Sequence, residues 1–292
     1  MSFKKVLVTG ANGQLGKCLK ELAKDQSNNH YHFIFKSFQE LDISDSKKVT
    51  TLFQKEQFDC CINCAAYTNV DNAEKEPDEA EKVNVFGVRN LAMACKNSGA
   101  TLVHISTDFV FDGESNLPYS EMDTTNPLGV YGKTKLEGEK GIAEILESHI
   151  IIRTSWLYSE YGSNFMKTML HLANANDEIS IVNDQLGSPT YAADLANVVL
   201  QILKEPNPTY GLYHFSNSGI TSWFEFAQKI YELSDIKIKT FPISTEEYPT
   251  LAKRPKFSAL DSTKIKSVFG VHLKPWQESL HTALFQLKKS NN

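Results

Sequence analysis

The first half of the chain alternates short apolar runs with longer segments of helical periodicity. Apolar runs such as 101–107 (TLVHIST) and 149–154 (HIIIRT) have the length and the continuous hydrophobicity of buried strands. Segment 14–25 instead repeats apolar residues every three or four positions, with Leu15, Leu19 and Leu22 on one face, which is typical of an amphipathic helix. Continuous apolar strands separated by such helices predict a parallel sheet covered on both faces.

This alternation lasts for about 155 residues and loosens after Trp156. We therefore predict an α/β protein with a doubly wound parallel sheet of the Rossmann type, formed by residues 1–156. Residues 157–292 are expected to form a smaller mixed α/β lobe, with some of its elements rejoining the first sheet. In such a sheet the loops that follow the strands lie along one edge, which is where ligands bind.

Composition and charge narrow the range of partners. Hydrophobic residues make up 41% of the 292 residues and charged residues 22%, which is ordinary for a globular protein. The net charge of -5 gives no basic surface for nucleic acid. No apolar run approaches the ~20 residues that span a bilayer. We expect neither nucleic acid nor a membrane as partner.

Cysteine usage predicts the compartment. The five cysteines are odd in number and all lie in the first third of the chain, which is unlike a disulfide framework. Cys61 and Cys64 form C-x-x-C, but inside an apolar run that reads as a buried strand, whereas a redox pair needs a stabilised thiolate. The N-terminal segment has no signal-peptide pattern. We expect packing roles for these thiols and a cytoplasmic protein.

A glycine-rich loop lies between the first strand and the first helix. The sequence VLVTGANGQLG places Gly10, Gly13 and Gly16 there, where small residues let backbone N–H groups approach a pyrophosphate at the positive end of the helix. The spacing is G-x-x-G-x-x-G rather than G-x-G-x-x-G, yet its position in the first βα unit favours dinucleotide binding. The loop residues Asn12, Gln14 and Leu15 belong to the same predicted site.

The second strand bears on which dinucleotide is bound. An acidic side chain at its end would hold the ribose 2′-hydroxyl of NAD, but the strand ends with Lys36. A lysine there favours a 2′-phosphate, so we expect NADPH in preference to NADH. Asp42 and Ile43 follow in the sequence LDIS and are expected near the adenine.

Three polar residues form a candidate catalytic set. Thr107 ends the strand 101–107, and Tyr131 and Lys135 follow four positions apart, one turn of a helix. Carbonyl reduction needs a hydride and a proton, and a tyrosine can supply the proton if its pKa is suitable. A nearby ammonium and the charged nicotinamide of the oxidised cofactor would lower that pKa from its usual value of ~10. The Thr107 hydroxyl could stabilise charge on the substrate oxygen.

Longer stretches of the sequence carry a resemblance to a known family. The glycine loop and Y-x-x-x-K resemble the extended short-chain dehydrogenase/reductases. STDFVFDG, DQLGSPTYAADLA and RPKFSALDSTK resemble, more narrowly, the dTDP-4-dehydrorhamnose reductase family, and the similarity covers almost the whole chain. The resemblance implies NAD(P)H-dependent reduction of the C4 keto group of dTDP-4-dehydro-6-deoxy-L-mannose to dTDP-L-rhamnose. The expected partner is thus a dTDP-linked ketosugar.

The resemblance also implies roles for particular residues. Thr107, Tyr131 and Lys135 match the catalytic trio, with Tyr131 as proton donor and Lys135 also binding the nicotinamide ribose. Further cofactor contacts are implied for the loop after the third strand and for the helix asparagine that supports the site, namely Cys64, Ala65, Ala66, Tyr67 and Asn84. Substrate contacts are implied for Thr107, Asp108, Phe109, Trp156, Gln185, Gly187 and Arg254.

Two positions depart from the family pattern. Phe109 stands where a tyrosine is common, so one hydroxyl is missing from the substrate side; a single hydrogen bond is worth ~1 kcal/mol and should not decide activity. Cys18, beside Lys17, stands where some members carry an acidic residue of a magnesium-linked dimer. We therefore expect no metal, and either a monomer or a homodimer.

Two other functions fit the same residues. Proteins that resemble this family serve as regulatory subunits, notably of methionine adenosyltransferase, and bind the cofactor without turnover. A reductase or epimerase of another nucleotide-linked ketosugar would also keep Thr107, Tyr131 and Lys135.

Overall fold

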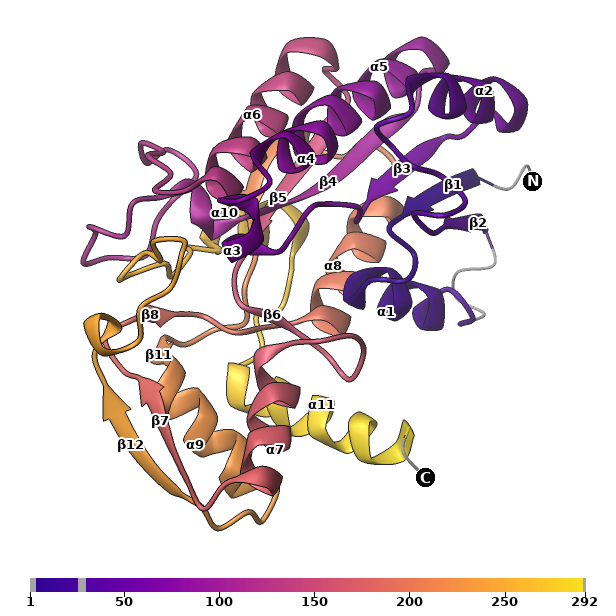
Figure 1. Cartoon of the computed structure of the whole chain (residues 1–292). Coiled ribbons are helices and arrows are strands. Elements are labelled where there is room, and N and C mark those ends of the chain that lie inside the picture. The colour runs from indigo at the N-terminus through magenta and orange to yellow at the C-terminus, as the bar shows by residue number, and fades with distance from the viewer. Residues whose placement is uncertain (1–3, 26–29, 291–292) are drawn as a thin grey trace.

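The computed structural model describes residues 4–25 and 30–290, so the first three residues of the N-terminal segment lie outside it. Its centre is a sheet of six parallel strands in the order β10-β5-β4-β3-β1-β2 (Figure 1). The strands are β1 (Lys4–Thr9), β2 (Tyr31–Lys36), β3 (Cys60–Asn63), β4 (Thr101–Thr107), β5 (His149–Thr154) and β10 (Gly211–His214).

Helices cover both faces of this sheet. One face packs against α1 (Gln14–Leu22), α8 (Ala192–Lys204) and α10 (Thr263–Phe269), and the other against α2 (Ser46–Glu56), α5 (Val88–Ser98) and α6 (Val130–Ile145) (Figure 1). The strands bury side chains on both faces: Val6 and Val8 of β1 belong to the first core and Leu7 to the second. This explains the continuous apolar runs, and the predicted doubly wound parallel sheet is confirmed.

The order of the strands indicates where a ligand site should lie. β2 lies on one side of β1 and β3 on the other, so the winding reverses beside β1. In open α/β sheets ligands bind outside the carboxyl ends of the strands at such a switch point. β10 comes from the stretch expected to form the second lobe, and it completes the sheet beside β5.

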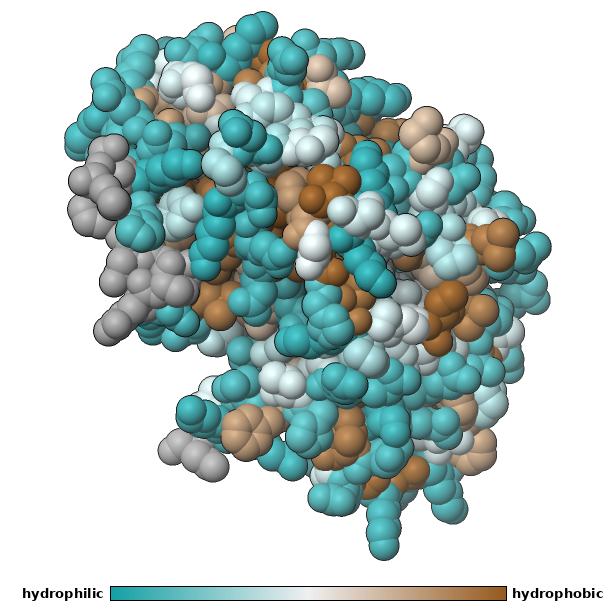
Figure 2. All heavy atoms as spheres, turned by 180° about the vertical axis from the view of Figure 1, so that it is seen from behind, coloured by the Kyte–Doolittle hydropathy of each residue, from teal (hydrophilic) through white to brown (hydrophobic). Residues whose placement is uncertain are grey.

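The remaining C-terminal elements form a separate small lobe below the central sheet (Figure 1). Tyr158, Phe226, Ile230 and Leu280 pack in its own core. Figure 2 shows that hydrophilic side chains dominate the surface seen from behind, with apolar residues in small scattered groups. The elements are β6 (Leu157–Tyr158), α7 (Phe165–Ala175), β7 (Glu178–Val182), β8 (Leu186–Gly187), β9 (Thr190–Tyr191), β11 (Thr221–Ser222), α9 (Trp223–Leu233), β12 (Lys239–Ile243), η4 (Thr245–Glu247) and α11 (Trp276–Ser290).

The helical segment 77–99 is interrupted in the structure. Segment 77–99 has the pattern of a single long helix, but the structure divides it into α4 (Pro77–Glu81), the π-helical turn η2 (Lys82–Gly87) and α5. Such turns shift the register of the following residues and often occur at functional sites. Two further short elements, α3 (Val70–Ala73) and η3 (Asp108–Val110), follow β3 and β4.

Among the residues that the structure describes, no helix is long and apolar enough to cross a membrane. All five cysteines are free thiols.

Candidate active site

The glycine loop approaches the backbone of the neighbouring strand too closely for any side chain. Gly10 has φ +64°, and a Cβ there would lie 2.7 Å from the backbone of Cys64 and Ala65. Gly13 precedes α1, and no side chain caps the first N–H groups of that helix. The first turn of α1 thus presents free donors where the strand order reverses, which is an arrangement suited to a pyrophosphate.

A cleft of about 870 Å³ extends from this loop along the carboxyl ends of the strands to the lobe. That volume lies within the usual range for small-molecule sites. The predicted residues that line it are Gly10, Asn12, Gly13, Gln14, Leu15, Gly16, Asp42, Ile43, Cys64, Ala65, Ala66, Tyr67, Thr107, Asp108, Phe109, Tyr131, Lys135 and Trp156. The cleft therefore brings together residues from all parts of the first 156 positions.

Several lining residues were missed by the sequence reasoning. Phe38, Gln39 and Ser44 line the end near α2, Thr154 ends β5, and Ser155 follows it. The signal for Phe38, Gln39, Thr154 and Ser155 was positional, because they lie at or just beyond the carboxyl end of a strand, where ligand contacts concentrate.

Tyr131 and Thr107 face each other at the middle of the cleft. Thr107 Oγ1 donates to Asp108 Oδ1 over 3.0 Å and accepts from the Phe109 N–H at 3.2 Å. The Phe109 ring packs edge-on against Tyr131 with 5.5 Å between ring centroids. Burial raises the pKa of Tyr131 to about 12, although a hydrogen bond with Thr107 opposes this shift. Because of this raised pKa, Tyr131 is a neutral phenol at neutral pH, the form that donates a proton.

Lys135 is buried one turn after Tyr131. Its Nζ donates to the carbonyl of Ile105 at 2.7 Å and lies 3.2 Å from His104 Nε2. Burial lowers the pKa of Lys135 to about 8, while the carboxylate of Glu139 and the thiol of Cys64 oppose the shift. The amine and ammonium forms are therefore close in free energy near neutral pH.

The π-helical turn positions Asn84 behind the cleft rather than in its lining. Asn84 Oδ1 accepts from the Tyr67 N–H at 2.9 Å, and its Nδ2 donates to the Tyr67 carbonyl at 3.1 Å and to Thr134 Oγ1 at 3.1 Å. One buried amide thus ties the loop after β3 to the helix that carries Tyr131. The structure gives Asn84 a supporting position and no direct exposure to the cleft.

Lys36 also lies outside the cleft lining. Its Nζ is 3.8 Å from the carboxylate of Glu40, and its backbone carbonyl accepts from the Ala11 N–H. Phe38 and Gln39 occupy the nearby wall instead.

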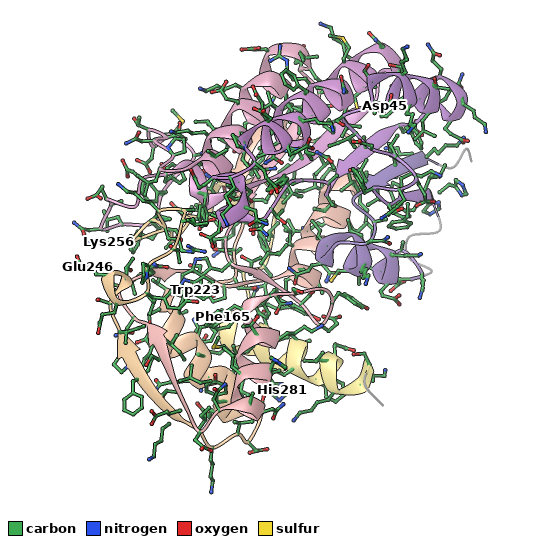
Figure 3. All side chains as sticks on the ribbon, in the orientation of Figure 1. Asp45, Phe165, Trp223, Glu246, Lys256 and His281 are labelled. Atoms are coloured by element: carbon green, nitrogen blue, oxygen red, sulfur yellow. The ribbon has the colours of Figure 1, made fainter. Side chains whose placement is uncertain are left out.

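A pair of stacked tryptophans forms the junction with the lobe. Trp156 lines the cleft with a left-handed backbone, φ +46°, and its ring stacks on Trp223 of the lobe at 3.5 Å between centroids. Phe165 packs against Trp223 with 4.5 Å between ring centroids, and Figure 3 shows these two side chains together at this junction. A Cβ at Gly187 would lie 2.6 Å from the Trp156 ring, so only glycine fits.

The predicted substrate residues of the lobe lie behind or beside this pair. Gln185 Oε1 accepts from Trp223 Nε1 at 3.2 Å, so Gln185 and Gly187 support the tryptophans from behind. Arg254 Nη2 donates to Asp71 Oδ2 of α3 at 2.8 Å. Gln185, Gly187 and Arg254 are thus outside the lining of the cleft. No group of three potential metal ligands occurs among the described His, Cys, Asp and Glu residues.

The fold, the glycine loop and the placement of Thr107, Tyr131 and Lys135 define the class: an extended short-chain dehydrogenase/reductase. The sequence model of the family described as RmlD substrate binding domain matches residues 4–289. The chain belongs to this family, that of the dTDP-4-dehydrorhamnose reductases.

Individual relatives are similar over nearly their whole length. A dTDP-4-dehydrorhamnose reductase of Aggregatibacter actinomycetemcomitans is 43% identical, over 94% of this chain and 97% of its own. The Clostridium acetobutylicum dTDP-4-dehydrorhamnose reductase structure has a TM-score of 0.93 at 43% identity, covering 97% of this chain and 99% of its own. The Bacillus anthracis enzyme, solved in complex with NADP, has the same TM-score at 41% identity and the same coverages.

Proposed function

We propose that this protein reduces the C4 keto group of dTDP-4-dehydro-6-deoxy-L-mannose with NAD(P)H, giving dTDP-L-rhamnose. The observation that carries the proposal is that Thr107, Tyr131 and Lys135 line the same cleft as the glycine loop after β1. Family membership narrows the substrate, because the relatives described above are named for this reduction.

The residues present fit a dinucleotide. Gly10 and Gly13 leave the backbone bare beside the free N-terminus of α1, and Asp42 and Ile43 line the far end of the cleft. The loop Cys64–Tyr67 and the side chains of Tyr131 and Lys135 would hold the nicotinamide half. The cofactor supplies the hydride for C4 of the sugar.

The chain's own residues then handle the oxygen and its proton. Tyr131, a neutral phenol, donates the proton that the oxygen gains as C4 is reduced. The Thr107 hydroxyl would turn from Asp108 Oδ1 to the substrate oxygen and donate a hydrogen bond that stabilises the developing negative charge. Lys135 in its ammonium form stabilises the phenolate left on Tyr131. Each of these side chains is held by the contacts described above before any ligand arrives.

The lobe supplies the sugar side of the site in this proposal. Trp156 offers a ring face in the cleft wall, Asp108 and Phe109 flank it, and Gln185 and Gly187 hold the wall from behind. Arg254 would bind the diphosphate after exchanging its present partner, Asp71. The five free thiols fit a reducing cytoplasm as the place of the reaction.

NADPH is the cofactor we propose, with Lys36 near its 2′-phosphate. The NADP complex of the Bacillus anthracis relative supports this choice. The ion pair of Lys36 with Glu40 would have to open, so NADH is expected to serve as well, at lower affinity.

The test is a reduction assay with purified protein, the ketosugar and either NADPH or NADH, followed by loss of cofactor absorbance. The proposal expects turnover, and a rate no higher than without protein would overturn it. In that event, co-purification with methionine adenosyltransferase would favour the regulatory function instead.

A matched pair of variants tests the proton donor. Tyr131→Phe should retain cofactor binding and lose turnover by ~10²–10⁴-fold, as is typical of general acid catalysis. Tyr210→Phe removes a hydroxyl from a tyrosine that is 42% exposed and follows α8 at the opposite edge of the sheet, and it should leave turnover unchanged. Unchanged turnover in Tyr131→Phe would show that another group donates the proton.

A further inference from the structure

A row of buried polar side chains runs through the sheet to Lys135. Thr9, Asn63 and His104 occupy paired positions on β1, β3 and β4, and each is at most 1% exposed. His104 Nε2 then lies 3.2 Å from Lys135 Nζ. None of the three polar side chains on the strands lines the cleft, so the row connects to the site through Lys135 and through the backbone of Ala65.

The amide of Asn63 has only one orientation that fits its neighbours. Its Oδ1 accepts from the Ala65 N–H at 3.1 Å and from Thr9 Oγ1 at 2.6 Å. A backbone N–H can only donate, so the oxygen must face Ala65. The amide nitrogen therefore faces His104 and donates to its Nδ1 over 2.9 Å.

This contact determines the tautomer of His104. Because Nδ1 accepts a hydrogen bond, the proton of a neutral imidazole must be on Nε2. Burial holds the pKa of His104 well below its usual range, so the ring is neutral. The Nε2–H bond then points at Lys135 Nζ.

An ammonium cannot satisfy this geometry, but an amine can. An ammonium group has three donors and no acceptor, so it would face the Nε2–H donor to donor. A free amine accepts from Nε2–H through its lone pair and still donates to the Ile105 carbonyl at 2.7 Å. The hydrogen-bond pattern thus favours the uncharged form of Lys135.

The other groups around Lys135 act in the opposite direction or not at all. Glu139, one turn further on α6, and Cys64 after β3 favour the ammonium, while Tyr131 is a neutral phenol. The guanidinium of Arg153 pairs with Glu139 at 2.6 Å, and Ser106 donates to the same carboxylate, so the influence of Glu139 on Lys135 is reduced. Apart from burial itself, His104 is the feature of the described surroundings that opposes the ammonium.

We propose that His104 is a positioning residue of this active site, whose Nε2–H, oriented by Asn63, donates to Lys135 Nζ and stabilises the free-amine form of Lys135 in the ligand-free protein. The functional consequence rests on the proposed reduction, in which the ammonium form of Lys135 stabilises the Tyr131 phenolate. Lys135 must then take up a proton from solvent, and His104 sets the pH above which this fails.

The decisive measurements are made on the ligand-free protein by NMR. Ring ¹⁵N shifts of His104, assigned by their loss in His104→Gln, should show a protonated Nε2 and a bare Nδ1. The ¹³Cε signal of Lys135, assigned by its loss in Lys135→Met, should titrate below the usual lysine range. A protonated Nδ1, or a Lys135 titration in the usual range, would overturn the proposal.

Variants then separate a tuning role from a structural one. In His104→Gln the side-chain oxygen can accept from an ammonium, so the Lys135 titration and the alkaline limb of the kcat/KM profile should both move up by about one pH unit. His281→Gln, on the exposed face of α11 (Figure 3), is the matched control and should move neither. An unmoved Lys135 titration in folded His104→Gln would overturn the proposal. The NMR results do not depend on ketosugar turnover, so a failure of the proposed function would be seen separately in the reduction assay.

Discussion

The two walls of the cleft are held in place by different kinds of interaction. On the sheet side, Lys135, Glu139 and Arg153 are at most 5% exposed and are bonded to neighbouring strands. On the lobe side, the contacts are the stacked rings of Trp156 and Trp223 and a half-exposed ion pair. Buried, fully bonded groups resist displacement, whereas stacked rings and exposed ion pairs exchange partners at little cost. The comparison indicates a fixed sheet wall opposite an adjustable lobe wall.

Of the variants considered, Arg153→Met should destabilise the fixed sheet wall the most. Arg153 pairs with Glu139 through Nε and Nη2 at 2.9 and 2.6 Å, and removing it leaves a buried carboxylate without its partner. We expect a loss of about 3–5 kcal/mol in the free energy of unfolding, measured by urea denaturation. Arg89→Met removes the exposed ion pair with Glu144 as a control and should cost less than about 1 kcal/mol. Equal losses in the two variants would remove the distinction between buried and exposed pairs.

Gly10→Ala should disturb the same wall at the cofactor end. The added Cβ meets the backbone of Cys64 and Ala65 at 2.7 Å and must also adopt φ +64°. We expect at least ~10-fold weaker NADPH binding by calorimetry, from the left-handed strain of ~1–2 kcal/mol and the displaced loop. Gly99→Ala is the matched control, because Gly99 has φ +72° with nothing within 4 Å of a Cβ. Gly99→Ala should lower the free energy of unfolding through a similar backbone strain and leave NADPH affinity unchanged. If Gly99→Ala also lost NADPH affinity, the loss in Gly10→Ala would be due to backbone strain alone.

Asp71→Asn should test the adjustable wall with the smallest effect. Asp71 and Arg254 are 36% and 26% exposed, so their ion pair should contribute less than about 1 kcal/mol. The hydrogen bond from Arg254 holds the pKa of Asp71 below its usual range. A depressed carboxyl pKa stabilises the fold above the unfolded value of about 4, and that stability is lost as the pH falls through the folded value. Unfolding curves should therefore differ slightly at pH 7 and converge once the pH falls below the folded-state pKa of Asp71. A loss as large as that of Arg153→Met would show that the lobe is also rigidly fixed.

The sheet wall could be predicted from the sequence because its signals are local. The apolar runs predicted the strands, and the glycine spacing marked the loop after β1. Thr107 was predicted from the end of a strand, and Tyr131 and Lys135 from their spacing of one helical turn. The catalytic geometry follows from these positions, since parallel strands bring their carboxyl ends to one edge.

The lobe wall, and the residues that support the site from behind, depend on contacts between residues far apart in the sequence. Arg254 and Asp71 are 183 positions apart, and Trp156 meets Trp223 only through the fold. The π-helical turn at Asn84 was missed because it owes its stability to Tyr67 and Thr134 rather than to helix propensity. Lys36 was placed correctly at the end of β2, but its side chain turns to Glu40, a choice that local pattern does not reveal.

The stack of Trp156 on Trp223 also links the position of the lobe to the absorption properties of the molecule. Two indoles nearly parallel, 5° apart, at 3.5 Å couple their electronic transitions. When the in-plane transition dipoles of the two rings are rotated relative to one another, such coupling gives paired circular dichroism bands of opposite sign, and these vanish when the rings separate. The circular dichroism of the unlabelled protein therefore reports whether the lobe wall has moved away from the sheet wall.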